Sequence, residues 1–97
     1  MRGEGIDFEF SEIESEAGYL PKLEKLWPTE DQRNRFVYKQ EWHNLMGALQ
    51  NLEESYREGA ITPEQELRYR ELKALLEDSV PILKRLGFTV PPVPLDG

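Results

Sequence analysis

Apolar side chains recur every three or four residues through two long stretches of the chain, which is the spacing of one face of an α-helix. In the first stretch this apolar stripe comprises Tyr38, Trp42, Leu45, Leu49, Leu52 and Tyr56. In the second stretch it comprises Tyr69, Leu72, Leu76, Val80, Leu83 and Leu86. The pattern predicts two long amphipathic helices whose stripes must be covered.

Start and stop signals set the expected bounds of these helices at 29–58 and 62–86. Thr29 and Thr62 each precede a glutamine by three positions, as in a capping box, and Gly59 and Gly87 are typical of helix C-termini. A connection of three or four residues makes the two helices an antiparallel αα-hairpin. Pro81 predicts a kink within the second helix rather than its division into two.

A two-helix hairpin buries only its facing stripes, so the all-α fold predicted here needs further cover. A short helix over 21–27, the ends of the chain, or a second copy could provide it within one domain, 1–97. Because small single cores are marginal, we expect a homodimer or higher homo-oligomer. The residues expected to mediate self-association are Phe36, Tyr38, Trp42, Leu45, Met46, Leu49, Leu52, Tyr56, Tyr69, Leu72, Leu75, Leu76 and Leu83.

The N-terminal arm, 1–18, has a different pattern. Apolar and acidic side chains alternate at its centre, and Gly18 and Pro21 then suggest a boundary. Alternation predicts either a short strand or an acidic, aromatic segment that docks on a partner; Phe8 and Phe10 could instead cover the protein's own core. The predicted partner-binding residues are Ile6, Asp7, Phe8, Glu9, Phe10 and Ile13.

The C-terminal tail, 88–97, contains three prolines and is expected to be extended. Pro91 and Pro94 have the spacing of a polyproline-II ligand, but no basic residue flanks them. We therefore expect Val90, Val93 and Leu95 to pack onto the hairpin.

Charge concentrates in the arm. The chain has a formal net charge of −7, and residues 1–18 contain one arginine and six acidic residues, a net charge of −5. An acidic protein is repelled by phosphate backbones, which argues against nucleic-acid binding. No apolar run is long enough for a membrane span, and neither a signal peptide nor a membrane partner is expected. These features predict a cytoplasmic protein.

Residue types limit the chemistry that the chain can perform. It has no cysteine and a single histidine, His43, which exclude thiolate chemistry and multi-histidine metal sites. The acidic residues of the second helix are interspersed with Arg68, Arg70 and Lys73, as on a solvated helix face. We therefore expect no catalytic, cofactor-binding or metal-binding residues.

The sequence favours a non-enzymatic interaction module that self-associates through the hairpin and docks a protein partner through the arm. One alternative is an acidic inhibitor, similar in kind to an antitoxin, that occupies a basic cleft on a nuclease or nucleic-acid-binding protein. A metal-dependent all-α hydrolase is the more remote alternative. Ionic strength distinguishes the first two, because only electrostatic docking weakens steeply with salt.

Overall fold

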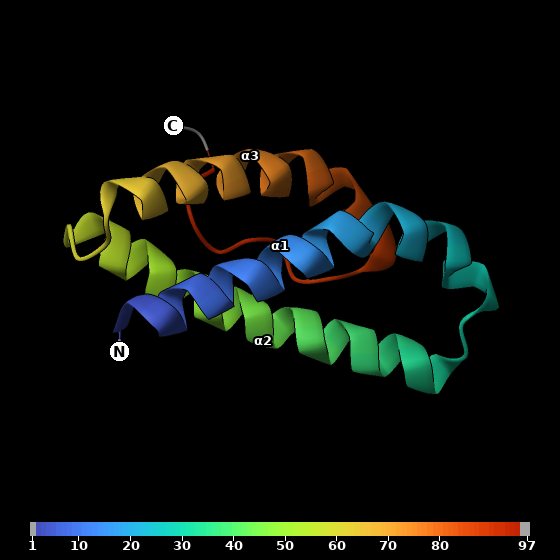
Figure 1. The fold of residues 1–97 in the computed structure, drawn as a ribbon. Coiled ribbons are helices and arrows are strands. Elements are labelled where there is room, and N and C mark those ends of the chain that lie inside the picture. Colours follow the sequence, from blue (N-terminus) through green and yellow to red (C-terminus); the bar gives the residue numbers. More distant parts are fainter. Residues whose placement is uncertain (1, 96–97) are drawn as a thin grey trace.

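The computed structural model describes residues 2–95, with side chains from residue 5 onward, and these residues form an all-α fold (Figure 1). The elements are α1 (Arg2–Leu26), a single 3₁₀ turn, η1 (Trp27–Thr29), α2 (Gln32–Arg57) and α3 (Pro63–Leu86). The first residue of the predicted arm and the last two of the tail, 96 and 97, lie outside the described residues.

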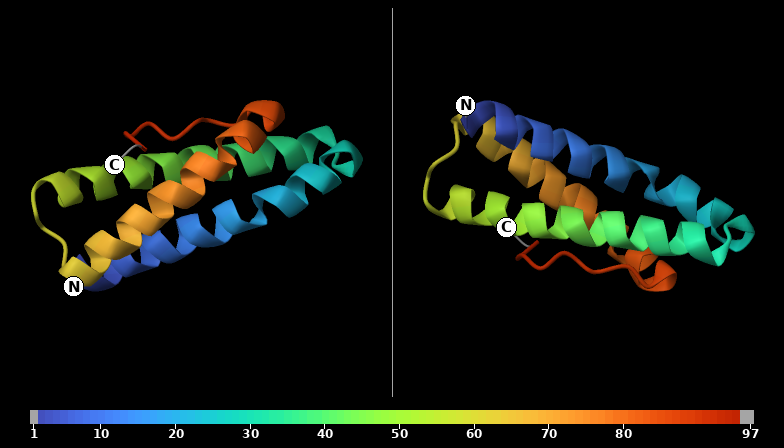
Figure 2. Two further views of the ribbon diagram at one scale, coloured as in Figure 1. Left: turned by 90° about the horizontal axis from the view of Figure 1, so that it is seen from above. Right: turned by 90° about the horizontal axis from the view of Figure 1, so that it is seen from below.

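The three helices alternate in direction. α1 and α3 run the same way and α2 runs between their ends in the opposite direction (Figures 1 and 2). The backbone of α1 approaches both α3 and α2 closely, and most extensively α3. α2 and α3, joined by a short loop, meet largely through side chains. Helix α1 therefore covers the apolar stripes of the other two helices.

Helix α1 corrects the expectation for the N-terminal arm. The structure has one continuous helix where an extended or strand-like arm and a separate short helix at 21–27 were expected. Pro21 lies inside α1, and Gly18 does not end it. The physical reason is packing: Phe10, Ile13 and Ala17 all become buried when this segment is helical, and burial of that size outweighs weak local propensity.

Capping explains where α2 and α3 begin. The Thr62 hydroxyl accepts from the Gln65 backbone at 3.1 Å, and the Gln65 side chain accepts from the Thr62 backbone at 3.0 Å, which confirms the predicted capping box. The start of α2 differs from prediction, because Asp31 is its N-cap and accepts from the Asn34 N–H at 2.8 Å. Thr29 instead donates to a carbonyl of the preceding turn.

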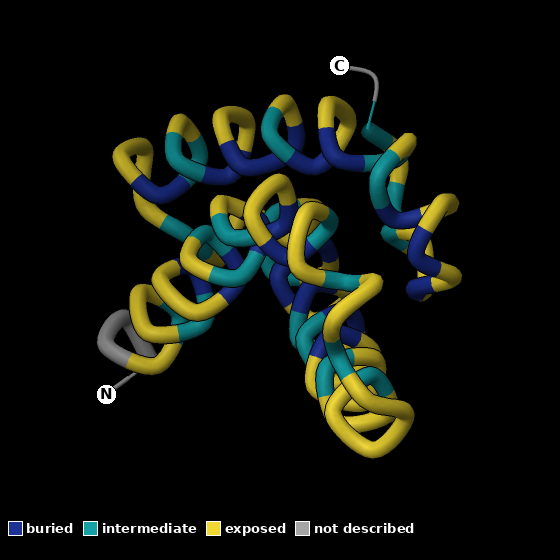
Figure 3. Tube along the Cα trace, turned by 90° about the vertical axis from the view of Figure 1, so that its right-hand side faces the viewer, coloured by how far each residue is buried: buried dark blue, intermediate teal, exposed yellow. Residues whose placement is uncertain are grey.

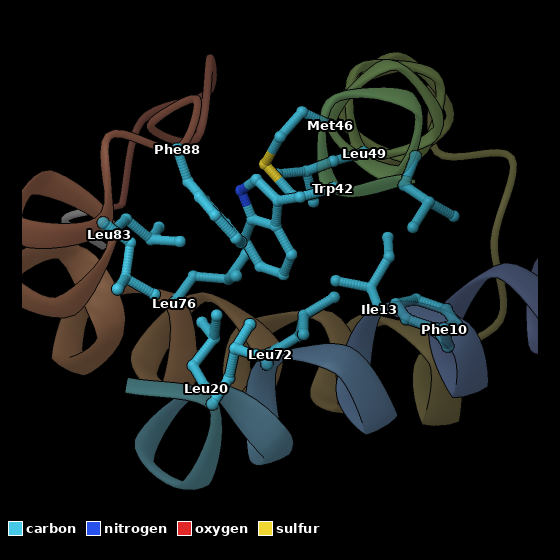
Figure 4. Packing of buried hydrophobic residues seen from close by; sticks show 14 of the residues in the cluster. Phe10, Ile13, Leu20, Trp42, Met46, Leu49, Leu72, Leu76, Leu83 and Phe88 are labelled. Atoms are coloured by element: carbon cyan, nitrogen blue, oxygen red, sulfur yellow. The ribbon is translucent and has the colours of Figure 1, made fainter. Parts of the chain in front are cut away.

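The core lies where all three helices face one another. Figure 4 shows side chains from α1, α2 and α3 meeting around Trp42. Figure 3 shows the same division along the trace, with buried positions turned inward and exposed positions outward. The fully buried large side chains are Phe10, Ile13, Leu20, Trp42, Met46, Leu49, Leu52, Tyr69, Leu72, Leu76 and Leu83.

The C-terminal tail completes the core. α3 continues unbroken through Pro81 to Leu86, and Gly87 then adopts φ +74°, a left-handed conformation that glycine tolerates. From there the chain turns back and runs beside α2 (Figure 2). Val93 and Leu95 pack against the core as predicted, whereas Val90 is exposed.

None of the helices in the described part of the chain combines the length and the apolar character needed to cross a bilayer.

Candidate functional site

The acidic residues of α1 fall on two sides of the helix. On the side facing α3, Arg68 forms a bidentate pair with Glu14, with nitrogen-to-oxygen distances of 3.0 and 2.7 Å, and lies 3.7 Å from Asp7. Glu24 and Arg85 form a second ion pair between these helices. Such pairs offset most of the negative charge on this side of α1 and fix its register on α3.

On the other side, α1 and α2 form a furrow with an acidic rim. One hollow, of about 390 Å³, lies between Ile6 and Glu9 of α1 and the last turns of α2. A second, of about 370 Å³, lies between Glu12 and Glu16 of α1 and Glu41 of α2. We define the acidic furrow by Glu9, Glu12, Glu16, Glu41 and Glu58.

No positive charge balances this rim. The residues that line the two hollows include neither lysine nor arginine. Among the described side chains, residues 5–95, none lies within ion-pair distance of Glu9, Glu12, Glu16 or Glu41. The furrow therefore differs from the α3 side of α1, where Asp7, Glu14 and Glu24 each lie beside an arginine.

Burial and mutual repulsion both raise the pKa of carboxylates in the furrow. Burial raises the pKa of Glu9, and the charge of Glu12 raises it further. Burial likewise raises the pKa of Glu16, with added repulsion from Glu41 and then Glu12. The ionised furrow is thus held under unfavourable electrostatic energy, which a bound positive charge would relieve.

A separate ionic cluster joins α2 to α3 inside the protein. Glu53 and Lys73 are only 6% and 8% exposed, and their charged atoms lie 3.0 Å apart. The Tyr69 hydroxyl donates to the same Glu53 oxygen at 3.2 Å, and the Lys73 ammonium lies 4.8 Å from the Tyr69 ring centre. Burial raises the pKa of Tyr69, so its hydroxyl stays protonated. All of these groups are satisfied within the chain, which is typical of a structural cluster.

The structure separates the residues predicted for the arm. Phe10 and Ile13 are fully buried and Ile6 is half-buried against the core, whereas Phe8 is 65% exposed. Asp7 faces α3, and Glu9 lines the acidic furrow. The aromatic and acidic parts of the predicted docking segment therefore do not form one surface.

Most residues predicted for self-association lie in the core of the single chain. Those that are buried are Trp42, Met46, Leu49, Leu52, Tyr69, Leu72, Leu76 and Leu83. Those packed at its edge and partly buried are Tyr38, Leu45, Tyr56 and Leu75. Phe36 is 66% exposed and lies outside this set.

Residues with metal-binding chemistry do not converge. Within the described residues, no three histidine or acidic side chains are grouped so that they could hold a metal ion. His43 is exposed, and its Nδ1 lies 3.1 Å from the Thr89 hydroxyl oxygen of the tail.

Sequence reasoning missed the part that α2 plays in the furrow. The sequence pattern does not place Glu41 or Glu58 beside the acidic arm, because their position opposite α1 depends on α1 being a helix. The available signal was helical spacing through the arm and beyond, carried by Ile6, Phe10, Ile13, Ala17, Leu20 and Leu23.

No family model, curated protein or solved structure matches this chain.

Proposed function

We propose that this chain is a non-enzymatic protein-interaction module whose acidic furrow binds a basic segment of a partner protein. The observation that carries the proposal is a hollowed surface, rimmed by five carboxylates, whose lining contains no base. A partner bearing lysine or arginine would offset the repulsion that, after burial, raises the pKa of Glu9 and Glu16.

Geometry suggests the form of the partner. Glu9 and Glu16 are seven residues apart on α1, about 10 Å along the helix axis. A basic helix with positive side chains two turns apart would match this spacing. The half-buried side chains of Ile6 and Leu45 add apolar contact area along the furrow.

This mode of binding is closer to the acidic-inhibitor alternative than to aromatic docking. Burial of Phe10 and Ile13 leaves Phe8 as the only large, mostly exposed apolar side chain among the predicted arm residues. Self-association stays a prediction, but the proposal does not use the predicted seam, since α1 covers it within one chain.

The test is titration with a defined probe, an alanine-based helical peptide bearing arginines two turns apart. We expect binding that weakens steeply as salt is raised from low to physiological concentration, because screening reduces interactions between exposed charges. The variant Glu9→Gln, Glu16→Gln, Glu41→Gln removes three furrow charges and should weaken binding by about tenfold or more.

A matched control removes three charges elsewhere. Glu71→Gln, Glu77→Gln, Asp78→Asn alters exposed residues of α3 and changes the net charge by the same amount. We expect this control to bind the peptide nearly as well as the unmodified chain. Equal loss in the two triple variants would show non-specific attraction and would refute the furrow as a site.

A further inference from the structure

The C-terminal tail is attached to α3 through a single tight turn. Gly87 adopts φ +74°, and the Phe88 N–H donates to the Leu83 carbonyl at 2.9 Å. Phe88 is buried, with its ring 5.4 Å from that of Trp27 and 6.5 Å from that of Trp42. The conformation of Gly87 therefore directs the tail back onto its own chain.

Beyond this turn the tail occupies a groove beside α2. The Trp42 indole N–H donates to the Thr89 carbonyl at 2.8 Å, which leaves neither group unsatisfied. Farther along, the half-buried Val93 and Leu95 pack against the core. Trp42 thus fixes the first residues of the tail against α2, through this hydrogen bond and through its ring beside that of Phe88.

The tail is held loosely after Thr89. Three of residues 91–95 are prolines and have no N–H to donate, and within the described chain no hydrogen bond joins 91–95 to the helices. A hollow of about 160 Å³ lies on one side, between His43 and Pro92, and another of about 300 Å³ lies beside Pro94. Attachment of residues 91–95 to the helices therefore relies on the apolar contacts of Val93 and Leu95.

We propose that this groove also accepts the tail of a second copy of the chain, so that two copies associate by exchanging residues 88–95. The structure already shows how such a tail binds the groove, including the hydrogen bond from the Trp42 indole to the Thr89 carbonyl. Beyond the turn, a tail from another copy would make the same contacts, so the exchange loses mainly the hydrogen bonds of the Gly87 turn itself.

Two quantities set the balance between the closed and the exchanged forms. A tethered tail has an effective concentration in the millimolar range, so exchange becomes appreciable only as the protein approaches that concentration. The second quantity is the conformational energy of residue 87, because the closed turn needs a positive φ there and an extended hinge does not. A β-branched residue there disfavours the closed turn and leaves the extended hinge unstrained.

Cross-linking tests the exchange directly, since the chain has no cysteine of its own. One copy carries His43→Cys and a second carries Thr89→Cys, at two exposed positions whose side chains touch in the closed form. After mixing at near-millimolar concentration, a short thiol-specific bismaleimide joins the two copies only if a tail has changed places. We expect at least fivefold more covalent dimer than with a Glu58→Cys and Thr89→Cys mixture, because the exposed Glu58, at the end of α2, lies about 22 Å along the helix from His43.

The hinge and a second pair complete the test. Adding Gly87→Val to both copies should raise the yield of the His43 and Thr89 pair severalfold and leave the Glu58 control unchanged. A mixture of Glu14→Cys and Arg68→Cys copies should stay uncrosslinked, because this pair joins α1 to α3 within each copy and lies far from the hinge. Dimer yields equal to the Glu58 control would overturn the proposal, and so would equal cross-linking of the Glu14 and Arg68 pair.

Discussion

At the scale of single residues, two neighbouring phenylalanines on α1 have opposite surroundings. Phe10 is fully buried and lies against Tyr69, with ring centres 6.2 Å apart, whereas Phe8 is largely exposed to solvent. Helical geometry places them 200° apart around the axis, so one can point inward while the other points outward.

This pair gives a direct prediction for stability. Phe10→Ala should reduce the free energy of unfolding by about 3–5 kcal/mol, because it removes a buried ring and leaves a cavity. Phe8→Ala should change it by less than about 0.5 kcal/mol. Urea unfolding followed by circular dichroism measures both, with Phe10→Leu as a milder variant that stays folded. Equal losses at the two positions would mean that α1 does not pack as described.

The buried ion pair gives a second prediction at this scale. Glu53→Ala leaves the Lys73 ammonium buried without a partner and should cost about 3–5 kcal/mol of unfolding free energy. Replacing Lys73 by Met in the same chain should recover most of this loss, since no unpaired charge then remains. Glu54→Ala, at the exposed neighbouring position, is the control and should have little effect. A Glu53→Ala chain as stable as that control would contradict the described burial of the pair.

At the scale of elements, the sequence predicts α2 and α3 within a few residues of their ends and does not predict α1. Thr62 and Gly59 define the boundaries of α3 and α2 by local chemistry that does not depend on the rest of the fold. α1 lacks such signals, and Gly18 and Pro21 suggest a break. Its helix forms because α2 and α3 supply the apolar surface that buries Phe10.

The same reason limits the prediction of the furrow. The arm's acidic residues, Glu9 among them, are evident from composition, but the surface they share with Glu41 exists only when α1 and α2 lie antiparallel. Local patterns specify which residues a helix contains. Its partner is specified by tertiary packing, which periodicity alone does not determine.

A glycine within α1 tests the helical assignment at this scale. Gly18 is exposed, and a methyl group added there would meet no atom within 4 Å. Gly18→Ala should therefore stabilise the fold by about 0.5–1 kcal/mol, as expected in a helix interior. Gly47→Ala in α2 has the same open surroundings and should give a similar gain. A gain at Gly47 without one at Gly18, measured by thermal unfolding, would argue against a helical α1.

At the scale of the whole molecule, the acidic residues of α1 divide into a side that pairs with arginines of α3 and a side that does not. Arg68 and Arg85 pair with the carboxylates that face α3. The carboxylates in the furrow remain unpaired by any described base and repel one another. Charge therefore identifies one surface of the molecule rather than the arm as a separate segment.

The furrow predicts how stability depends on pH. Because the folded-state pKa of Glu16 is raised, its protonation favours the fold, and ionising it as pH rises through that pKa reduces stability. Glu16→Gln should therefore raise the unfolding free energy at pH 7 by a few tenths of a kcal/mol, after solvent screening. The gain should vanish near pH 3, where glutamate in the unmodified chain is protonated as well.

Comparison with a surface variant makes the result specific. Glu71→Gln removes one charge from an exposed position on α3 and should give a smaller gain at pH 7. Urea unfolding of both variants at the two pH values provides the comparison. A larger gain for Glu71→Gln, or a gain for Glu16→Gln that persists at pH 3, would be inconsistent with repulsion in the furrow.

The central claim is that the acidic N-terminal segment is a core helix of this molecule. Amide hydrogen exchange, resolved along the chain, tests it most directly, because protected amides require a hydrogen-bonded and buried segment. We predict that amides 10–24 of α1 are protected to a degree comparable with 42–52 of α2 and 69–83 of α3. Exchange of 10–18 at the rate of an unstructured peptide, while α2 and α3 remain protected, would contradict the account.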